Sequence, residues 1–334
     1  MRIIKAFKNQ FGENKKKADK RMWGYMVGKF VAGLAVALIL IGLSYIILYP
    51  LIYSVSQAIR TTDDMYDKTI IYIPKHFTLD NFAQAWKILD FPTTLTNTFN
   101  ISFWPTILQV CSCALAGYGF ARFKFRGKGI LFLLVLLTII IPPSTIMIPL
   151  YTNFRQFDPL YIATAMHSFG WISEPYLNLT DSLWSFILPA LFAAGIKSGL
   201  FVFVYRQFFQ GFPKELEEAA YIDGCGPVMT FLRILVPNAT PAFVTVFLFC
   251  IVWYWNDYYT VPMFLPNIPT LPSVLSSMHS TMTGYGGAYA GDAAVTLYPI
   301  LRAGIVLYIA PLLITFIIFQ RKFTESIARS GIVG

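Results

Sequence analysis

The sequence predicts an all-α integral membrane protein with six transmembrane helices. Of its 334 residues, 56% are hydrophobic and only 13% are charged, whereas charged residues make up about a quarter of an ordinary soluble domain. The mean hydropathy is +0.58, and apolar runs recur that are long enough to cross about 30 Å of hydrocarbon as helices. We therefore expect the chain to lie in a lipid bilayer.

Six apolar segments have the required length. Their expected bounds are 30–54, 95–119, 129–152, 182–205, 238–263 and 296–319. The first is too long for the apolar core of a signal peptide, and no small-residue cleavage site follows it, so we expect it to be retained. Pro142 and Pro143 lie inside the third segment, where proline is expected to kink or break the helix.

The basic residues predict the orientation of these spans. Most of the 26 Lys and Arg residues fall in four segments, 1–29, 120–128, 206–237 and 320–334. The positive-inside rule places these segments, and hence both termini, in the cytoplasm. Topology therefore explains the net charge of +9, and we expect no nucleic-acid partner.

The same topology divides the chain. The expected parts are a basic cytoplasmic segment (1–29), a transmembrane domain (30–320) with a cytoplasmic loop (206–237) and external loops (55–94, 153–181 and 264–295), and a cytoplasmic tail (321–334). The third external loop is rich in Pro, Gly and Ser. It is either a flexible connector or a loop that reaches an external partner, because long loops without structure are often functional.

No motif in the sequence indicates catalysis or metal binding. Cys111 and Cys113 lie in an apolar run without a nearby histidine, so packing is their expected role. The three histidines are isolated from one another, and no metal-site spacing emerges. The phosphate-binding pattern GxxxxGK[ST] does not occur. We expect a non-catalytic chain with no cofactor or metal of its own, so an ATP-driven step would need another chain.

The polar stretch 211–237 interrupts the apolar chain between the fourth and fifth spans. Its first part predicts a short helix, because Pro213 suits a first helical position and glutamates follow in the first turns, where the helix dipole favours them. Gly224 is expected to end this helix in the left-handed conformation. A second, mostly apolar helix is expected to begin at Pro227 and to stop at Pro237.

Such a helix–turn–helix at the cytoplasmic surface has two interpretations. One is an amphipathic hairpin resting on lipid, which usually carries Lys and Arg on its polar face. Here the first helix is acidic, which opposes anionic lipid. A protein partner therefore fits better, and the adjacent Ala219 and Ala220 are small enough to allow its close approach.

The stretch resembles the EAA loop of the inner-membrane permeases of ATP-binding-cassette (ABC) importers. That signature is EAA, three residues, Gly, nine residues, Ile, one residue and Leu-Pro. The matching positions here are Glu218, Ala219, Ala220, Gly224, Ile234 and Pro237, with Val236 in place of the usual leucine. The strings RQFFQGFPKELEEAAYIDG, ALAGYGFARFKFRGKG, TIMIPLY and WYWNDYY are similar to the carbohydrate-uptake branch, which includes the smaller permease of the maltose transporter. The resemblance runs from about residue 45 to the C-terminus, although 153–182 and 264–295 look longer than usual.

This resemblance implies a fold, a location and partners. The fold would be the type I ABC importer permease fold, in the cytoplasmic (inner or plasma) membrane of a bacterium. The chain would pair with a second, homologous permease and with two ATPase subunits that bind ATP and Mg, while an external solute-binding protein delivers an oligosaccharide. The residues implied to couple to the ATPase are Glu218, Ala219, Ala220, Asp223, Gly224, Ile234 and Pro237.

A polar and aromatic cluster near the outer half of the fifth span is the best candidate for contacts with a sugar. Sugars are bound by aromatic faces together with hydrogen-bonding side chains. The cluster consists of Trp253, Trp255, Asn256, Asp257 and Tyr258. A cavity position is favoured for Asn256, whereas an interfacial aromatic belt is favoured for the tyrosine. Asp257 would face a partner or a wet cavity, or would be a helix-end acid.

Two basic residues inside expected spans leave further alternatives open. Lys197, in the fourth span, indicates a water-filled path or an ion pair, or else a shifted boundary with a snorkelling ammonium. Arg302 is expected to be an interfacial anchor near the outer end of the sixth span. Together they leave both neutral and acidic sugars open as substrates.

The alternative function is a secondary carrier driven by an ion gradient. Such carriers usually show internal repeats and intramembrane acids for ion coupling. No repeat is evident, and Asp257 is the main acidic candidate in a span. The spacing of the EAA-like loop favours the importer permease.

Overall fold

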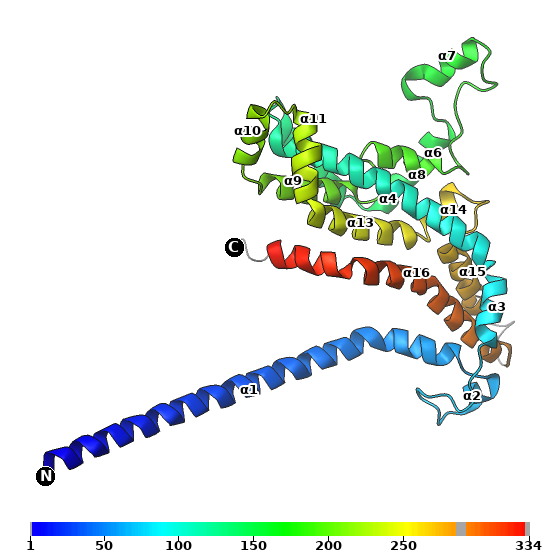
Figure 1. Ribbon diagram of the computed structural model, residues 1–334. Helices are drawn as coiled ribbons and strands as arrows, with labels where there is room; N and C mark the ends of the chain where they lie inside the picture. The colour runs from blue at the N-terminus through cyan, green and yellow to red at the C-terminus, as the bar shows by residue number, and fades with distance from the viewer. Residues whose placement is uncertain (1, 285–291, 331–334) are drawn as a thin grey trace.

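A computed structural model describes residues 2–284 and 292–330 of the chain, with side chains described for 25–278 and 297–321. Within these residues the regular structure is helical, apart from two isolated bridges, Arg60–Phe77 and Phe157–Leu177. The all-α prediction is therefore confirmed. Figure 1 shows the helices gathered into an elongated bundle from which α1 diverges.

Most of the helices follow one another with short connections, apart from the longer segments 67–79 and 169–183. They are α1 (Arg2–Ala58), α2 (Thr62–Tyr66), α3 (Asp80–Ile88), α4 (Phe91–Arg122), α5 (Lys128–Ile140), α6 (Pro143–Arg155), the 3₁₀ turn η1 (Pro159–Tyr161), α7 (Ile162–Ser168), α8 (Trp184–Leu191), α9 (Ser198–Gln210), α10 (Glu215–Ile222), α11 (Pro227–Thr230), the π turn η2 (Phe231–Leu235), α12 (Val236–Asn238), α13 (Thr240–Trp255), α14 (Thr260–Phe264), α15 (Leu271–Gly284) and α16 (Asp292–Ser330).

Three described helices are long and apolar enough to cross a membrane by themselves. They are Tyr25–Ala58 within α1, the whole of α4, and Leu297–Arg321 within α16. Two bent pairs raise the number to five if each counts as one span: α5 with α6, bent by 105°, and Pro227–Asn238 with α13, bent by 78°. The count of six and the cytoplasmic placement of both termini stay predictions.

The expected break in the third span is confirmed. Ile141 and Pro142 both have extended backbone, with ψ of 123° and 132°, and Pro143 opens α6. A residue that precedes proline is driven out of the α region, so the Pro142-Pro143 pair forces two consecutive residues to leave the helix.

The expected fourth helix, 182–205, is not continuous. α8 ends at Leu191 and α9 begins at Ser198, and Ala193 and Lys197 between them have φ of 53° and 58°. Irregular backbone at membrane depth needs hydrogen-bond partners from the protein. α4 supplies them: Ser112 Oγ donates to the Ala190 carbonyl at 2.6 Å, and Gln109 Nε2 donates to the Ile196 carbonyl at 2.6 Å.

The fifth helix is also shorter than expected, because α13 ends at Trp255 rather than near residue 263. Asp257 Oδ1 accepts the backbone N–H groups of Thr260 and Tyr259, at 2.7 and 3.2 Å. This local turn takes the chain out of α13 and into α14, so the aromatic cluster is divided between a helix end and a turn.

Regular structure extends into the predicted loops and ends. α15 occupies much of the Pro-, Gly- and Ser-rich segment 264–295, while 285–291 lie outside the described residues. The basic segment 1–29 is continuous with the first span, since α1 begins at Arg2. The tail 321–334 begins as the last turns of α16.

The first external loop is ordered around a buried carboxylate. Asp64 is 2% exposed and accepts hydrogen bonds from the backbone N–H groups of Lys75 and His76, at 2.7 and 2.8 Å. Burial raises the pKa of the Asp64 carboxyl, but these bonds and the His76 ring outweigh it and hold the pKa below its ordinary value. The loop is therefore a folded unit that joins α1 to α3.

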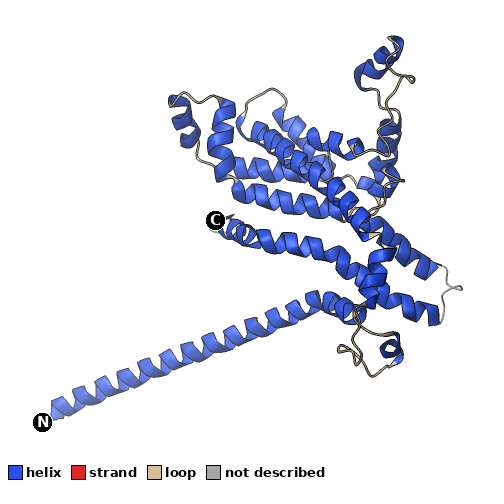
Figure 2. Cartoon of the chain, turned by 45° about the vertical axis from the view of Figure 1, so that its right-hand side comes forward, coloured by secondary structure: helices blue, strands red, loops and turns tan. Residues whose placement is uncertain are grey.

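The main core lies among α4, α9 and α13, which run side by side in both views (Figures 1 and 2). Its largest fully buried side chains include Phe201, Tyr205 and Phe209 of α9 and Val246 of α13. α4 extends from the end of the molecule that holds α3 to the end that holds α10 and α11 (Figure 1). By contrast, none of the best 18-residue window in Tyr25–Ala58 is buried.

Candidate functional site

The stretch 211–238, here named the 211–238 loop, has the predicted helix–turn–helix form. Gly224 has φ of +81° between α10 and α11. The N–H of Cys225 donates to the Ala220 carbonyl at 2.9 Å, and the N–H of Gly224 donates to the Tyr221 carbonyl at 3.1 Å. These two bonds form a Schellman motif, which ends a helix with a left-handed residue. The role expected of Gly224 in the turn is confirmed.

The second helix of the loop continues past its expected end. It passes through the π turn η2 and through Pro237 before α12 ends at Asn238. The wide turn lies just before the proline, which lacks the N–H that an α-helix requires. The chain then bends by 78° into α13, so the loop is joined directly to a helix of the core.

One face of α10 is fixed to the end of α4. Arg122 Nε lies 2.6 Å from Glu217 Oε1, and the two side chains are only 9% and 10% exposed. Arg122 Nη2 also donates to the Phe212 carbonyl at 2.8 Å. Because Arg122 is the last residue of α4, this ion pair ties the loop to a helix that is long and apolar enough to cross a membrane. Ala220 is buried on the same face.

Around this contact the loop exposes a set of apolar side chains, here named the apolar tip. Its residues are Leu216, Tyr221, Ile222, Val228, Met229 and Leu232, of which Ile222 and Val228 are 86% and 72% exposed. Glu218, Ala219, Asp223 and Gly224 are exposed nearby. The two alanines therefore differ from the expectation that both face a partner, since Ala219 is exposed and Ala220 packs inward. Ile234 is half-buried and Pro237 is exposed.

The structure brings together two of the residues predicted for the substrate path. The Lys197 ammonium lies 5.0 Å from the centre of the Trp253 ring. Lys197 precedes α9 at the break after α8, and Trp253 is on α13 and 45% exposed. The cation therefore meets an aromatic face rather than an acid, which is a favourable arrangement.

Trp255 does not belong with these residues. It is 3% exposed and packs against Leu89, Phe91 and Leu271, with its ring 6.4 Å from that of Tyr308. Three consecutive residues of a helix point in different directions, so Trp253 and Trp255 cannot share a face. Trp255 is a core residue, and its prediction as a path residue is not supported by its burial.

Asn256 and Tyr258 line a cavity of about 380 Å³ between the first turns of α15 and the segment 301–308 of α16. The other lining residues are Pro272, Leu275, Ser276, Leu301, Ile305 and Tyr308. Asn256 Nδ2 donates to the Val252 carbonyl at 2.7 Å, and its Oδ1 accepts from the Tyr308 hydroxyl. The volume falls in the range of small-ligand sites, roughly 300–1,000 Å³. Asp257 is not among the lining residues and instead caps its own turn.

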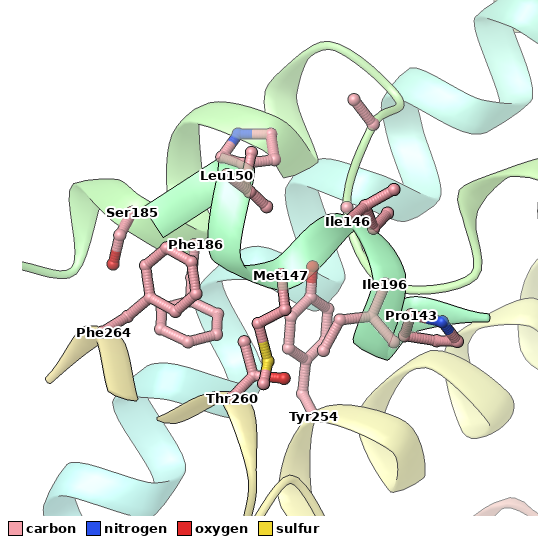
Figure 3. A pocket seen from close by; sticks show the side chains of 13 residues that line it. Pro143, Ile146, Met147, Leu150, Ser185, Phe186, Ile196, Tyr254, Thr260 and Phe264 are labelled. Atoms are coloured by element: carbon pink, nitrogen blue, oxygen red, sulfur yellow. The ribbon is translucent and has the colours of Figure 1, made fainter. Parts of the chain in front are cut away.

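A second cavity, of about 120 Å³, lies where three helices are interrupted. Figure 3 shows Pro143 and Met147 of α6, Ile196 of the break before α9, Tyr254 of α13 and Thr260 of α14 converging on it. The irregular backbone after α5, α8 and α13 therefore meets around one small hollow. Discontinuous helices of this kind form ligand sites in many membrane proteins.

A buried hydrogen-bond network holds this region together, and it was not among the features predicted from the sequence. The Tyr254 hydroxyl donates to Gln109 Oε1 at 2.6 Å, and Gln109 Nε2 donates to Ser198 Oγ at 2.9 Å as well as to Ile196. Gly195 is required here, because a Cβ would lie 2.5 Å from both Gln109 Oε1 and the Tyr254 oxygen. The only sign of this network in the sequence was Gln109 itself, a lone glutamine in an apolar span.

Replacing Gln109 with leucine is expected to lower the thermal stability of the purified chain. The substitution removes the side-chain donor to the Ile196 carbonyl and the acceptor of the Tyr254 hydroxyl, at a cost of about 1–3 kcal/mol for each buried group. Unfolding in detergent would measure this, with Gln84→Leu at an exposed position of α3 as the control. Equal unfolding temperatures for the two variants would contradict the role of the network.

The sequence of this region decides the family. The family of binding-protein-dependent transport system inner membrane components matches residues 113–329, well over half of the chain, including the 211–238 loop and both cavities. The chain belongs to this family. Its members are inner-membrane components of transport systems, so the permease is a membrane transport protein.

Curated relatives of the permease are also named as permeases of transport systems. It is 28% identical over 290 residues to a probable ABC transporter permease of Bacillus subtilis, covering 86% of this chain and 84% of the relative. It is 30% identical over 297 residues to an arabinooligosaccharide transport permease of Halalkalibacterium halodurans, covering 87% and 93%. A diacetylchitobiose uptake permease of Streptomyces coelicolor is 24% identical, covering 86% and 84%.

A solved structure shares the fold of the permease. It is a chain of a bacterial ABC transporter involved in the import of the acidic polysaccharide alginate, with a TM-score of 0.66. The match covers 88% of this chain and 96% of the other, at 20% sequence identity. The predicted ABC importer permease fold is thus confirmed over most of the chain.

Proposed function

We propose that this permease forms half of the path by which an ATP-driven importer moves a sugar or oligosaccharide across the bacterial inner membrane. The observation that carries the proposal is the construction of the 211–238 loop. It presents an apolar tip outward, and the buried Arg122–Glu217 pair ties its other face to α4. A surface of this kind fits a protein partner, and the tie lets movement of the loop reach a membrane-crossing helix.

The loop residues divide between docking and support. Glu218, Ala219, Asp223 and Gly224 are exposed beside the apolar tip, where acids can pair with basic groups of an ATPase. Ala220 is buried, Ile234 is half-buried, and Pro237 lies at the bend, so these three set the position of the tip. ATP and Mg would be bound by the ATPase and not by this chain.

The remaining partners follow from the family and from the surface of α1. Many apolar side chains of Tyr25–Ala58 are exposed, so this helix is available to lipid and to a second, homologous permease. Two ATPase subunits would engage the two permeases, and a solute-binding protein would deliver the substrate from outside. The names of the relatives, which include arabinooligosaccharide and diacetylchitobiose permeases, support a sugar as the solute.

Co-purification tests this proposal most directly. The tagged permease, expressed with the proteins encoded beside it, is expected to elute with a second permease and an ATPase dimer. In nanodiscs, that complex should hydrolyse ATP faster when a loaded sugar-binding protein is added. A lone chain that transports solute along an ion gradient would overturn the assignment and favour the secondary carrier.

Asn256→Ala is expected to lower sugar uptake while leaving the complex assembled. The amide is exposed at the cavity of about 380 Å³ and could bond sugar hydroxyls, and losing one such bond corresponds to about a two- to tenfold effect. The measurement is uptake of labelled sugar in cells, normalised to complex amount, with Gln84→Ala as the control. By contrast, Trp255→Ala should reduce the amount of folded protein. Unchanged uptake by Asn256→Ala would remove this cavity from the path.

A further inference from the structure

A third cavity, of about 360 Å³, lies at the end of α6, away from the two cavities described above. Tyr151, Thr152, Arg155, Gln156, Tyr176 and Asn178 line it. All six carry a hydroxyl, an amide or a guanidinium, whereas aliphatic side chains line much of the other two cavities. This polar hollow differs in kind from a lipid-facing groove.

The two walls of the hollow come from segments that the backbone holds together. Phe157 and Leu177 exchange two backbone hydrogen bonds of 2.9 Å, and the N–H of Leu179 donates to the Phe154 carbonyl at 2.9 Å. These bonds place Tyr176 and Asn178 opposite the last turn of α6. The hollow is therefore preformed, and it lies away from α10 and α11 (Figure 1).

Arg155 is the feature that indicates a ligand. It is the only Lys or Arg in residues 129–196, and no described side chain pairs with its guanidinium. Its position at the end of α6 is favourable for a cation. That position does not explain the two phenol rings and two amides beside it, since a helix end needs none of them.

We propose that this hollow binds a negatively charged sugar unit, such as a uronate, of the transported oligosaccharide. The Arg155 guanidinium would pair with the carboxylate through two parallel hydrogen bonds. The rings of Tyr151 and Tyr176 would pack on the apolar faces of the sugar, and Gln156 and Asn178 Nδ2 would bond its hydroxyls. Asn178 Oδ1 is already engaged by Thr180, at 2.6 Å from its hydroxyl, which leaves the amide nitrogen for the ligand.

The inference rests on the proposed function in one respect, namely that the solute is a sugar. A carboxylate of a docking protein would also satisfy Arg155. The mixture of a guanidinium, phenols and amides favours a small ligand, because a protein side chain would bring one carboxylate and leave the phenols and amides without a role.

Calorimetric titration of the full chain in nanodiscs with trigalacturonate tests the site. The matched neutral probe is the methyl ester of the same trisaccharide, which keeps the shape and removes the charge. Wild type is expected to bind the acid at least tenfold more tightly than the ester. Arg155→Gln should abolish this difference, and Arg155→Lys should retain part of it, because lysine keeps the charge without the planar fork.

The control is Lys68→Gln, which removes one exposed positive charge elsewhere in the predicted external loops. It should bind as wild type does, and both variants should unfold at the wild-type temperature. Equal affinity of wild type for acid and ester, or no binding of either, would overturn the site. ATP-driven uptake of a neutral sugar without trigalacturonate binding would overturn the site but not the proposed function. Charge-dependent binding in a chain that never assembles with an ATPase would support the site and overturn the proposed function.

Discussion

Replacing Gly224 with valine is expected to lower ATP-driven uptake strongly while leaving the chain folded in the membrane. Gly224 has φ of +81°, in the left-handed region of backbone conformation. A residue with a Cβ pays a conformational free energy of about 1–2 kcal/mol there, and the cost is highest for β-branched residues. Relief of that strain would break the two Schellman bonds and turn α10 relative to α11. The apolar tip would then no longer fit the ATPase, and we expect uptake to fall by about tenfold or more.

Gly226→Val is the matched control for this experiment. Gly226 has an extended backbone, with φ of −77° and ψ of 169°, which valine adopts readily before a proline. A Cβ at either glycine would meet no atom within 4 Å, so the two variants differ in backbone conformation and not in crowding. Uptake and ATPase activity of the purified complex are the measurements. Wild-type uptake by Gly224→Val would contradict the account of the turn.

Arg122→Met is expected to have the second large effect. The substitution leaves the Glu217 carboxylate buried without its partner, and breaking a buried pair from one side costs about 3–5 kcal/mol. α10 would leave the end of α4, and both the unfolding temperature and uptake should fall. Arg126→Met, an exposed arginine four residues further along, should behave as wild type.

The double variant Arg122→Met with Glu217→Leu separates charge from packing. Replacing both members of a buried pair with apolar residues is often neutral or stabilising, so the unfolding temperature should return to near the wild-type value. If the double variant were as unstable as Arg122→Met alone, the ion pair would not be what holds the loop to α4. Differential scanning fluorimetry in detergent is sufficient for this comparison.

Local signals in the sequence were enough to predict the 211–238 loop. Gly224 and Pro227 act through their own backbone, so the turn and the start of the second helix follow from residue type alone. The attachment of the loop to α4 does not follow from residue type. Arg122 and Glu217 are far apart in the chain, and Arg122 contributed to the sequence analysis only as one more positive charge.

The candidate path was harder to predict because α13 is apolar on all sides. In such a helix, composition does not indicate which face is buried, so Trp253 and Trp255 looked equivalent although one is half-exposed and the other is in the core. The break between α8 and α9 was missed for a related reason. Its carbonyls are bonded by Gln109 and Ser112 of another helix, a contact that no local pattern reveals.

α15 shows the reverse error, in which local composition was misleading. Pro272 stands in its first turn, where proline is tolerated. Its serines bond back to the carbonyls one turn earlier, as Ser277 does to Val274 at 2.8 Å. Packing of Leu271 and Val274 into the core with Phe91 and Trp255 stabilises the helix despite its weak propensity.

The unwound backbone between α8 and α9 also sets an order of events during biosynthesis. A continuous helix such as α1 can pass from the insertion machinery into lipid without another helix beside it, because its peptide groups bond one another. The segment 190–197 cannot, because lipid has no donor for the Ala190 and Ile196 carbonyls, which Ser112 and Gln109 bind. α4 precedes this segment in the chain, so the ribosome delivers the helix that supplies the missing bonds before it delivers the helix that needs them.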